Sequence, residues 1–96
     1  MEGKAKEAFE KWFKNNYLDN WIYYNRPDNK TIINSLKIEW LDSVGIHVTV
    51  SYWSITNKWQ DLILGFYNGS FEHNTRQEAT EAAIKKAVEI YNARFS

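Results

Sequence analysis

Cysteine is absent from the 96 residues of this sequence. The chain therefore has no disulfide bond, no thiol nucleophile and no thiolate metal ligand. This absence fits a reducing compartment, and we expect a cytoplasmic protein. The stretch 1–13 is charged and amphipathic, which is not typical of an export signal. No apolar run approaches the roughly 20 residues that a helix needs to cross a bilayer, so we expect no membrane association.

An excess of charge of one sign is also missing. Twelve basic and twelve acidic side chains give a formal net charge of +0, which argues against general attraction to nucleic acid or to membrane surfaces. The four glycines form no phosphate-binding loop. Aromatic side chains are abundant instead, at 17% of the residues. Length and composition together predict a single domain, residues 1–96, with one modest core.

The clearest local pattern predicts a C-terminal amphipathic helix over residues 75–95. Thr75 and Glu78 have the spacing of a capping box. In that motif the threonine hydroxyl accepts the amide of Glu78, and the Glu78 carboxylate reaches back to the amide of Thr75. The inward side carries a row of small residues, which lets the backbone approach its neighbours and predicts bulky aromatic partners. That row is Ala79, Ala83 and Ala87.

The N-terminal third has helical spacing of its apolar residues. We expect a helix over 4–17, continued or followed by a second helical piece to residue 24, and an end near Pro27. The stretch 30–45 is ambiguous, because some of its apolar residues alternate as in a strand. Most of them fit a helix better, and Gly45 stands where a C-terminal glycine cap belongs. We therefore interpret this stretch as a helix, with a strand as the alternative.

Residues 46–55 alternate apolar and polar side chains and predict a strand. The stretch 56–60 breaks the alternation and is interpreted as a loop. A second strand is expected over 61–67, followed by a turn at Asn68-Gly69 and a short third strand over 70–73. The predicted fold class is α+β, with N-terminal helices, a two- to three-stranded antiparallel meander and a C-terminal amphipathic helix packed on the sheet.

Two segments resemble a known group of proteins. They are WLDSVGI (residues 40–46), with the alternating strand after it, and TRQEATEAAIKKAVEIYN (residues 75–92). Both are similar to segments of small proteins encoded by phages, prophages and other mobile elements of gut-type bacteria. The resemblance covers most of the chain from Pro27 onward and is looser before it. This chain also has the polar NKT where such proteins often continue with apolar residues. The resemblance implies the fold and no activity, cofactor or catalytic residue.

The sequence offers few candidates for chemistry. His47 and His73 are the only histidines, and a metal site would need a third ligand such as Glu72 or Asp61 without any recognised ligand spacing. Asp42, Ser43 and His47 lie close in sequence but lack the glycine-framed serine of a hydrolase. Glu39 and Asp42 fit a solvated helix face. We therefore expect no catalytic residue, no metal ligand and no cofactor, and thus no enzyme.

The best functional candidate is an aromatic face of the predicted sheet. Trp53, Ile63 and Tyr67 are expected to point away from the side of Val48 and Leu64, and Trp59 is expected in the loop between the strands. An exposed patch of this kind is typical of a protein interface. The alternative is that the N-terminal aromatic segment covers this face and makes it part of the core. The aromatic residues of that segment are Trp21, Tyr23 and Tyr24.

Two functional hypotheses follow from this face. The first is a small non-enzymatic module that binds a protein partner or a second copy of itself. The second is single-stranded nucleic-acid binding, in which bases stack on the aromatic strands and nearby basic residues contact phosphates. The zero net charge and the lack of a basic cluster count against the second. The basic residues considered for it are Arg26, Lys30, Lys37 and Lys58.

Overall fold

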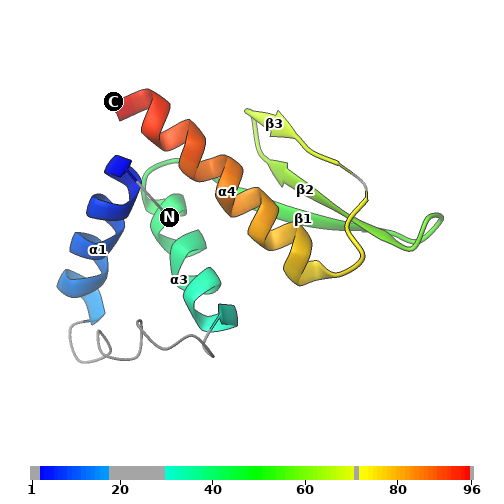
Figure 1. Cartoon of the computed structure of the whole chain (residues 1–96), viewed down its shortest axis with the longest axis horizontal. Helices are drawn as coiled ribbons and strands as arrows, with labels where there is room; N and C mark the ends of the chain where they lie inside the picture. The colour runs from blue at the N-terminus through cyan, green and yellow to red at the C-terminus, as the bar shows by residue number, and fades with distance from the viewer. Residues whose placement is uncertain (1–2, 18–29, 71, 96) are drawn as a thin grey trace.

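A computed structural model describes residues 3–17, 30–70 and 72–95 of the chain. Three helices and three strands are defined there, in an order that confirms the predicted α+β class (Figure 1). The expected helical piece at 17–24 lies largely outside the described residues, as do the Pro27 turn and the aromatic segment 21–24. The elements are α1 (Gly3–Tyr17), α3 (Lys30–Ser43), β1 (Val48–Trp53), β2 (Lys58–Ile63), β3 (Tyr67–Asn68) and α4 (Arg76–Phe95).

Helix α4 is the central element of the fold. It packs on β1 and β2 with one side and contacts α1 and α3 with another (Figure 1). The row of small residues along it is fully buried, as predicted, since Ala79, Ala83 and Ala87 have no exposed surface. The aromatic bulk of the core comes from α1 and α3 rather than from the sheet. It consists of Phe9, Phe13 and Trp40.

Local capping explains where helix α3 ends. Helix α3 ends in a Schellman motif, in which the amides of Gly45 and Ile46 donate to the carbonyls of Asp42 and Leu41 at 3.1 and 2.9 Å. Gly45 has a φ of 83°, a conformation that glycine adopts without the Cβ penalty of other residues. The helical interpretation of residues 30–45 is thereby confirmed, because a strand would not leave this pattern of bonds.

The predicted cap of α4 is confirmed in one of its two bonds. The amide of Glu78 donates to the Thr75 hydroxyl at 3.1 Å. The returning bond differs from the prediction, because the Glu78 carboxylate accepts the amide of Asn74 at 3.1 Å instead of that of Thr75. The carboxylate thus satisfies a donor one residue before the cap, and the start of α4 is still closed.

The strands form an antiparallel sheet in the order β1-β2-β3. The expected loop at 56–60 was wrong, because the turn lies at 54–57 and β2 begins at Lys58. Asn57 takes the positive φ (55°) that closes this turn. The first half of β2 contains the polar residues Lys58 and Gln60, and its sequence therefore resembles that of a loop.

The end of the second strand also differs from the prediction. Residues 64–66 form a turn around Gly65, whose φ is 81°. The third strand is therefore the short β3 at Tyr67–Asn68 rather than a strand over 70–73. An isolated bridge between Trp59 and His73 is the part of the predicted pairing at 70–73 that forms.

Candidate functional site

The strand register divides the predicted aromatic face. Val48 lies opposite Ile63, and Ile63 lies opposite Tyr67, so these three side chains share the face of the sheet that α4 covers. Ile63 is fully buried and Tyr67 packs against the core. Trp53 belongs to the other face. The expectation that Trp53, Ile63 and Tyr67 point the same way was therefore wrong, because Ile63, and not Leu64, shares a face with Val48.

Trp59 lies in β2 rather than in a loop, on the same face as Ile63. It pairs with Tyr52 across the strands, and their ring centroids are 5.0 Å apart. The guanidinium of Arg76, the first residue of α4, lies 4.9 Å from the Trp59 ring centroid. The two rings are tilted by 55° to each other. Trp59 is half-buried, so this cluster of Tyr52, Trp59 and Arg76 is one partly accessible aromatic surface of the sheet next to the start of α4.

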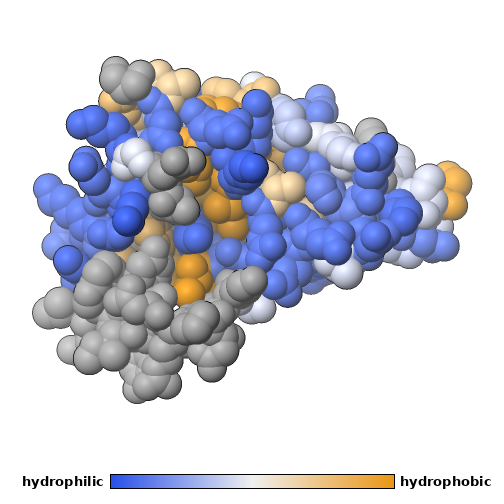
Figure 2. All heavy atoms as spheres, viewed as in Figure 1, coloured by the Kyte–Doolittle hydropathy of each residue, from blue (hydrophilic) through white to orange (hydrophobic). Residues whose placement is uncertain are grey.

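The end of the β1–β2 hairpin carries large apolar side chains in solvent. We call the group Tyr52, Trp53 and Ile55 the hairpin tip; their exposed fractions are 50%, 44% and 91%. The Trp53 indole N–H donates to Gln60 at 3.2 Å on the outer face. The hairpin projects past the start of α4 (Figure 1), and Figure 2 shows a hydrophobic group at that end of the molecule. The Tyr52 hydroxyl donates to Asn57 Oδ1 at 2.8 Å. The tip is thus apolar and projecting, and side-chain hydrogen bonds hold both of its rings.

A buried acidic group lies under α4. The side chain of Asp61 is only 3% exposed, and its carboxylate accepts a hydrogen bond from His73 Nε2 at 2.9 Å. The Lys86 ammonium lies nearby, 5.1 Å from the centroid of the Tyr67 ring. Together they border a shallow pocket of about 370 Å³ between the sheet and α4. From the sequence, Asp61 and His73 were considered only as hypothetical metal ligands. In the structure their side chains are hydrogen-bonded to each other.

Gly69 is required at its position because Asp61 occupies the space beside it. A Cβ atom at Gly69 would lie 2.3 Å from the Asp61 carboxylate, and the Gly69 amide donates to the Asp61 carbonyl at 2.8 Å. The expected turn signal Asn68-Gly69 therefore has a different cause, namely close approach to a buried side chain and not a hairpin turn.

Gly69→Ala should lower the free energy of unfolding by about 2 kcal/mol, because the added methyl group displaces the buried carboxylate. Urea denaturation followed by tryptophan fluorescence measures this change. The same substitution in an Asp61→Ala background should cost clearly less, since the clashing group is gone. Equal costs in the two backgrounds would show that Asp61 is not what excludes a side chain at this position.

His47 also pairs with an aspartate, but this pair lies on the surface. His47 Nδ1 lies 2.7 Å from Asp42 Oδ1, and both side chains are about half exposed. Ser43 does not join them, because its hydroxyl donates to the Trp40 carbonyl at 2.5 Å. Across the described ranges, no three His, Cys, Asp or Glu side chains are grouped as a metal site would require.

The basic residues considered for nucleic-acid binding do not gather around the aromatic strands. Lys58 donates to Asn74 beside the start of α4. Lys37 lies in α3, where burial of its ammonium lowers its pKa below 10.5 while Glu81 opposes that shift. Arg26 and the side chain of Lys30 lie outside what the structure describes. Other cations lie beside single aromatic rings: Arg76 beside the half-buried Trp59, Lys86 beside Tyr67 and Arg94 beside Phe66.

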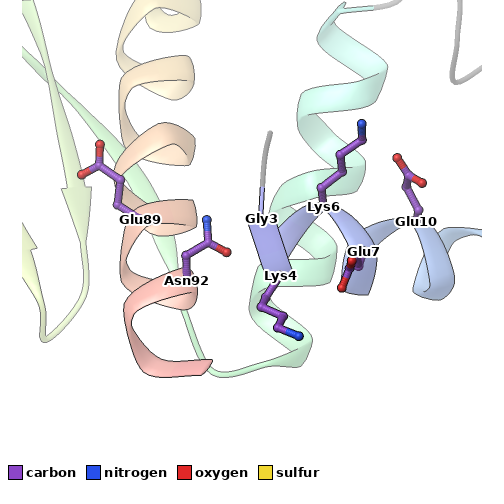
Figure 3. A pocket seen from close by; sticks show the side chains of 7 residues that line it. All are labelled: Gly3, Lys4, Lys6, Glu7, Glu10, Glu89 and Asn92. Carbon is purple, nitrogen blue, oxygen red and sulfur yellow. The ribbon is translucent and has the colours of Figure 1, made fainter. Parts of the chain in front are cut away.

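The larger surface hollow, of about 910 Å³, lies between the start of α1 and the end of α4. Figure 3 shows that charged side chains of both signs border it, including Lys4 and Glu7. Asn92 closes one side and accepts the Ala5 amide at 2.8 Å, which caps the start of α1. This hollow is mixed in charge, and we assign no ligand to it.

Comparison with known proteins adds no identification, since no protein family, curated protein or solved structure matches the chain. Among the helices that the structure describes, none is long and apolar enough to cross a membrane.

Proposed function

We propose that this chain is a small protein-interaction module without catalytic activity, and that it contacts its partner through the hairpin tip. The observation that carries the proposal is the exposure of Tyr52, Trp53 and Ile55 at the projecting end of one hairpin. Tryptophan and tyrosine are the side chains most often found as anchors of protein interfaces. The proposal replaces the broader face expected from sequence, of which the tip keeps only Trp53.

The charge distribution supports a protein partner. The tip carries no charged side chain, and the chain as a whole is neutral, so apolar contact rather than electrostatic steering would supply the binding energy. The resemblance to phage and mobile-element proteins adds a proposed setting, in which the partner is a protein of the bacterial cytoplasm.

Replacing the tip with small or polar residues should abolish partner binding. In an affinity capture from nuclease-treated bacterial lysate, we expect a retained protein that is lost with the double variant Trp53→Ala/Ile55→Ser. With the isolated partner, loss of the two side chains should weaken binding by about tenfold or more. The matched control is Ile32→Ser, because Ile32 is 61% exposed on α3, away from the hairpin. Unchanged capture by the tip variant would refute the proposal.

The alternative is single-stranded nucleic-acid binding, which the cluster of Tyr52, Trp59 and Arg76 favours. Bases stack on such rings, and a guanidinium beside them contacts phosphate. Fluorescence anisotropy with a labelled single strand tests this directly. Binding that weakens with salt and is lost in Trp59→Ala and Arg76→Gln, but not in Trp53→Ala, would establish the alternative and displace the tip proposal. Absence of binding at low salt would eliminate it.

A further inference from the structure

Among the residues that the structure describes, strand β1 is an unprotected edge of the sheet. The strand order β1-β2-β3 leaves β1 with one neighbour. Its six residues, VTVSYW, include no charged residue, no proline and no glycine. Natural proteins usually protect an edge strand with such residues or with a bulge, because an exposed edge pairs readily with another strand. None of these side-chain devices is present in β1.

The backbone groups along this edge follow from the bonding pattern to β2. The amide of Leu64 donates to the carbonyl of His47 at 3.0 Å, which marks these two as a hydrogen-bonded pair. Bonded pairs alternate along an antiparallel ladder, so Thr49 and Ser51 direct their amides and carbonyls toward β2. Val48, Val50 and Tyr52 direct theirs outward. In the described part of the chain, those outward backbone groups have no hydrogen-bond partner.

The side chains of β1 are arranged symmetrically about Val50. On either side of it stand a hydroxyl residue, Thr49 or Ser51, and then an apolar residue, Val48 or Tyr52. An antiparallel strand of the same sequence, centred on the same valine, would therefore pair like with like. No charges would oppose each other, because the strand carries none. Pairing with a strand of another protein does not require this symmetry. The symmetry therefore favours a second copy of the same chain as the partner.

We propose that two copies of the protein pair antiparallel through β1 about a two-fold axis at Val50. Val50 then faces the partner's Val50, Val48 faces the partner's Tyr52, and Thr49 faces the partner's Ser51. The outward amides and carbonyls of the three alternate residues form the ladder between the chains. The two three-stranded sheets become one continuous sheet, in an isologous arrangement of the kind that dominates homodimers. This interface shares Tyr52 with the hairpin tip of the proposed function, whereas Trp53 and Ile55 lie outside the ladder.

Charges placed at the two hydroxyl positions test both the contact and its register. In sedimentation velocity and light scattering over a concentration series, the purified wild-type chain should reach twice the 11.4 kDa mass of one chain. Thr49→Lys/Ser51→Lys places lysines opposite lysines across the axis and should give a monomer. Thr49→Lys/Ser51→Glu places each lysine opposite a glutamate of the other copy and should restore the dimer. Circular dichroism and thermal unfolding confirm that each variant is folded.

Three results would overturn the proposal. The first is a wild-type mass of one chain at every concentration. The second is equal dimerisation of the two charged variants, which would show that positions 49 and 51 do not face each other. The third is a dimer that the hairpin-tip variant Trp53→Ala/Ile55→Ser disrupts and the lysine pair does not, which would place self-association at the tip. Because these measurements use the purified chain alone, they are independent of whether the lysate partner is found.

Discussion

Replacing His73 with alanine should lower the free energy of unfolding by about 3 kcal/mol, because it leaves the buried carboxylate of Asp61 without its hydrogen-bond donor. Asp61 is only 3% exposed, so its carboxylate has little contact with water in the folded protein and depends on the imidazole for this hydrogen bond. His73 also bridges to Trp59, where the Trp59 amide donates to the His73 carbonyl at 2.8 Å. That backbone bond survives the substitution, so the loss reports the side-chain pair. Urea denaturation of the purified chain measures it.

The exposed pair provides the matched control for this experiment. His47→Ala removes the same kind of side chain from the same kind of partner, Asp42, where both are about half exposed. That substitution should cost well under about 1 kcal/mol, since water takes the place of the lost contact. His73→Gln should recover part of the stability lost in His73→Ala, because its amide can donate to Asp61. Equal costs at positions 47 and 73 would show that burial of Asp61 does not govern the pair.

Trp40→Ala should have the largest effect of any substitution considered, at about 4 kcal/mol of unfolding free energy. Trp40 is 2% exposed, and it joins α3 to two other helices. Its ring centroid lies 5.9 Å from that of Phe9 in α1 and 4.9 Å from that of Tyr91 in α4. Removal of the indole leaves a cavity that three helices border, and it also removes two aromatic contacts.

The comparison for Trp40 is Trp53→Ala, which removes the same side chain from the exposed hairpin tip. It should cost clearly less than Trp40→Ala, about 1 kcal/mol, since Trp53 is 44% exposed and its removal loses less buried area than removal of the 2% exposed Trp40. Urea denaturation curves of the two variants under the same conditions give the two unfolding free energies to be compared. A small loss for Trp40→Ala would mean that the packing of α1, α3 and α4 does not depend on this ring.

The local parts of the fold were predictable because their signals lie within a few residues of one another. The capped start of α4, the glycine-terminated end of α3 and the alternation of β1 each depend on near neighbours in sequence. The buried row of Ala79, Ala83 and Ala87 was likewise correct, because helical periodicity places those residues on one side. The errors lie at the turns, where Asn57 and Gly65 shift the ends of β2 from the positions that the polar residues indicated.

The candidate site was less predictable, because it depends on pairing between strands. The prediction placed Leu64 on the face of Val48 and Ile63 on the exposed aromatic face. The observed register differs by one residue, and it places Ile63 in the core opposite Val48. Side chains alternate along a strand, so such a shift exchanges the two faces of the whole strand. The pairing of Asp61 with His73 was not predicted for the same reason, since twelve positions separate them in sequence and only the bridge from β2 to residue 73 brings them together.

By itself, the sequence determined the helices, the presence of an antiparallel hairpin and the α+β class, because capping, periodicity and turn residues act over short distances along the chain. Only the tertiary structure decided which aromatic residues remain exposed, that Asp61 is buried beside His73 and that β1 forms an open edge. These properties depend on the register of the strands and on where α4 crosses the sheet, which contacts between distant parts of the chain establish.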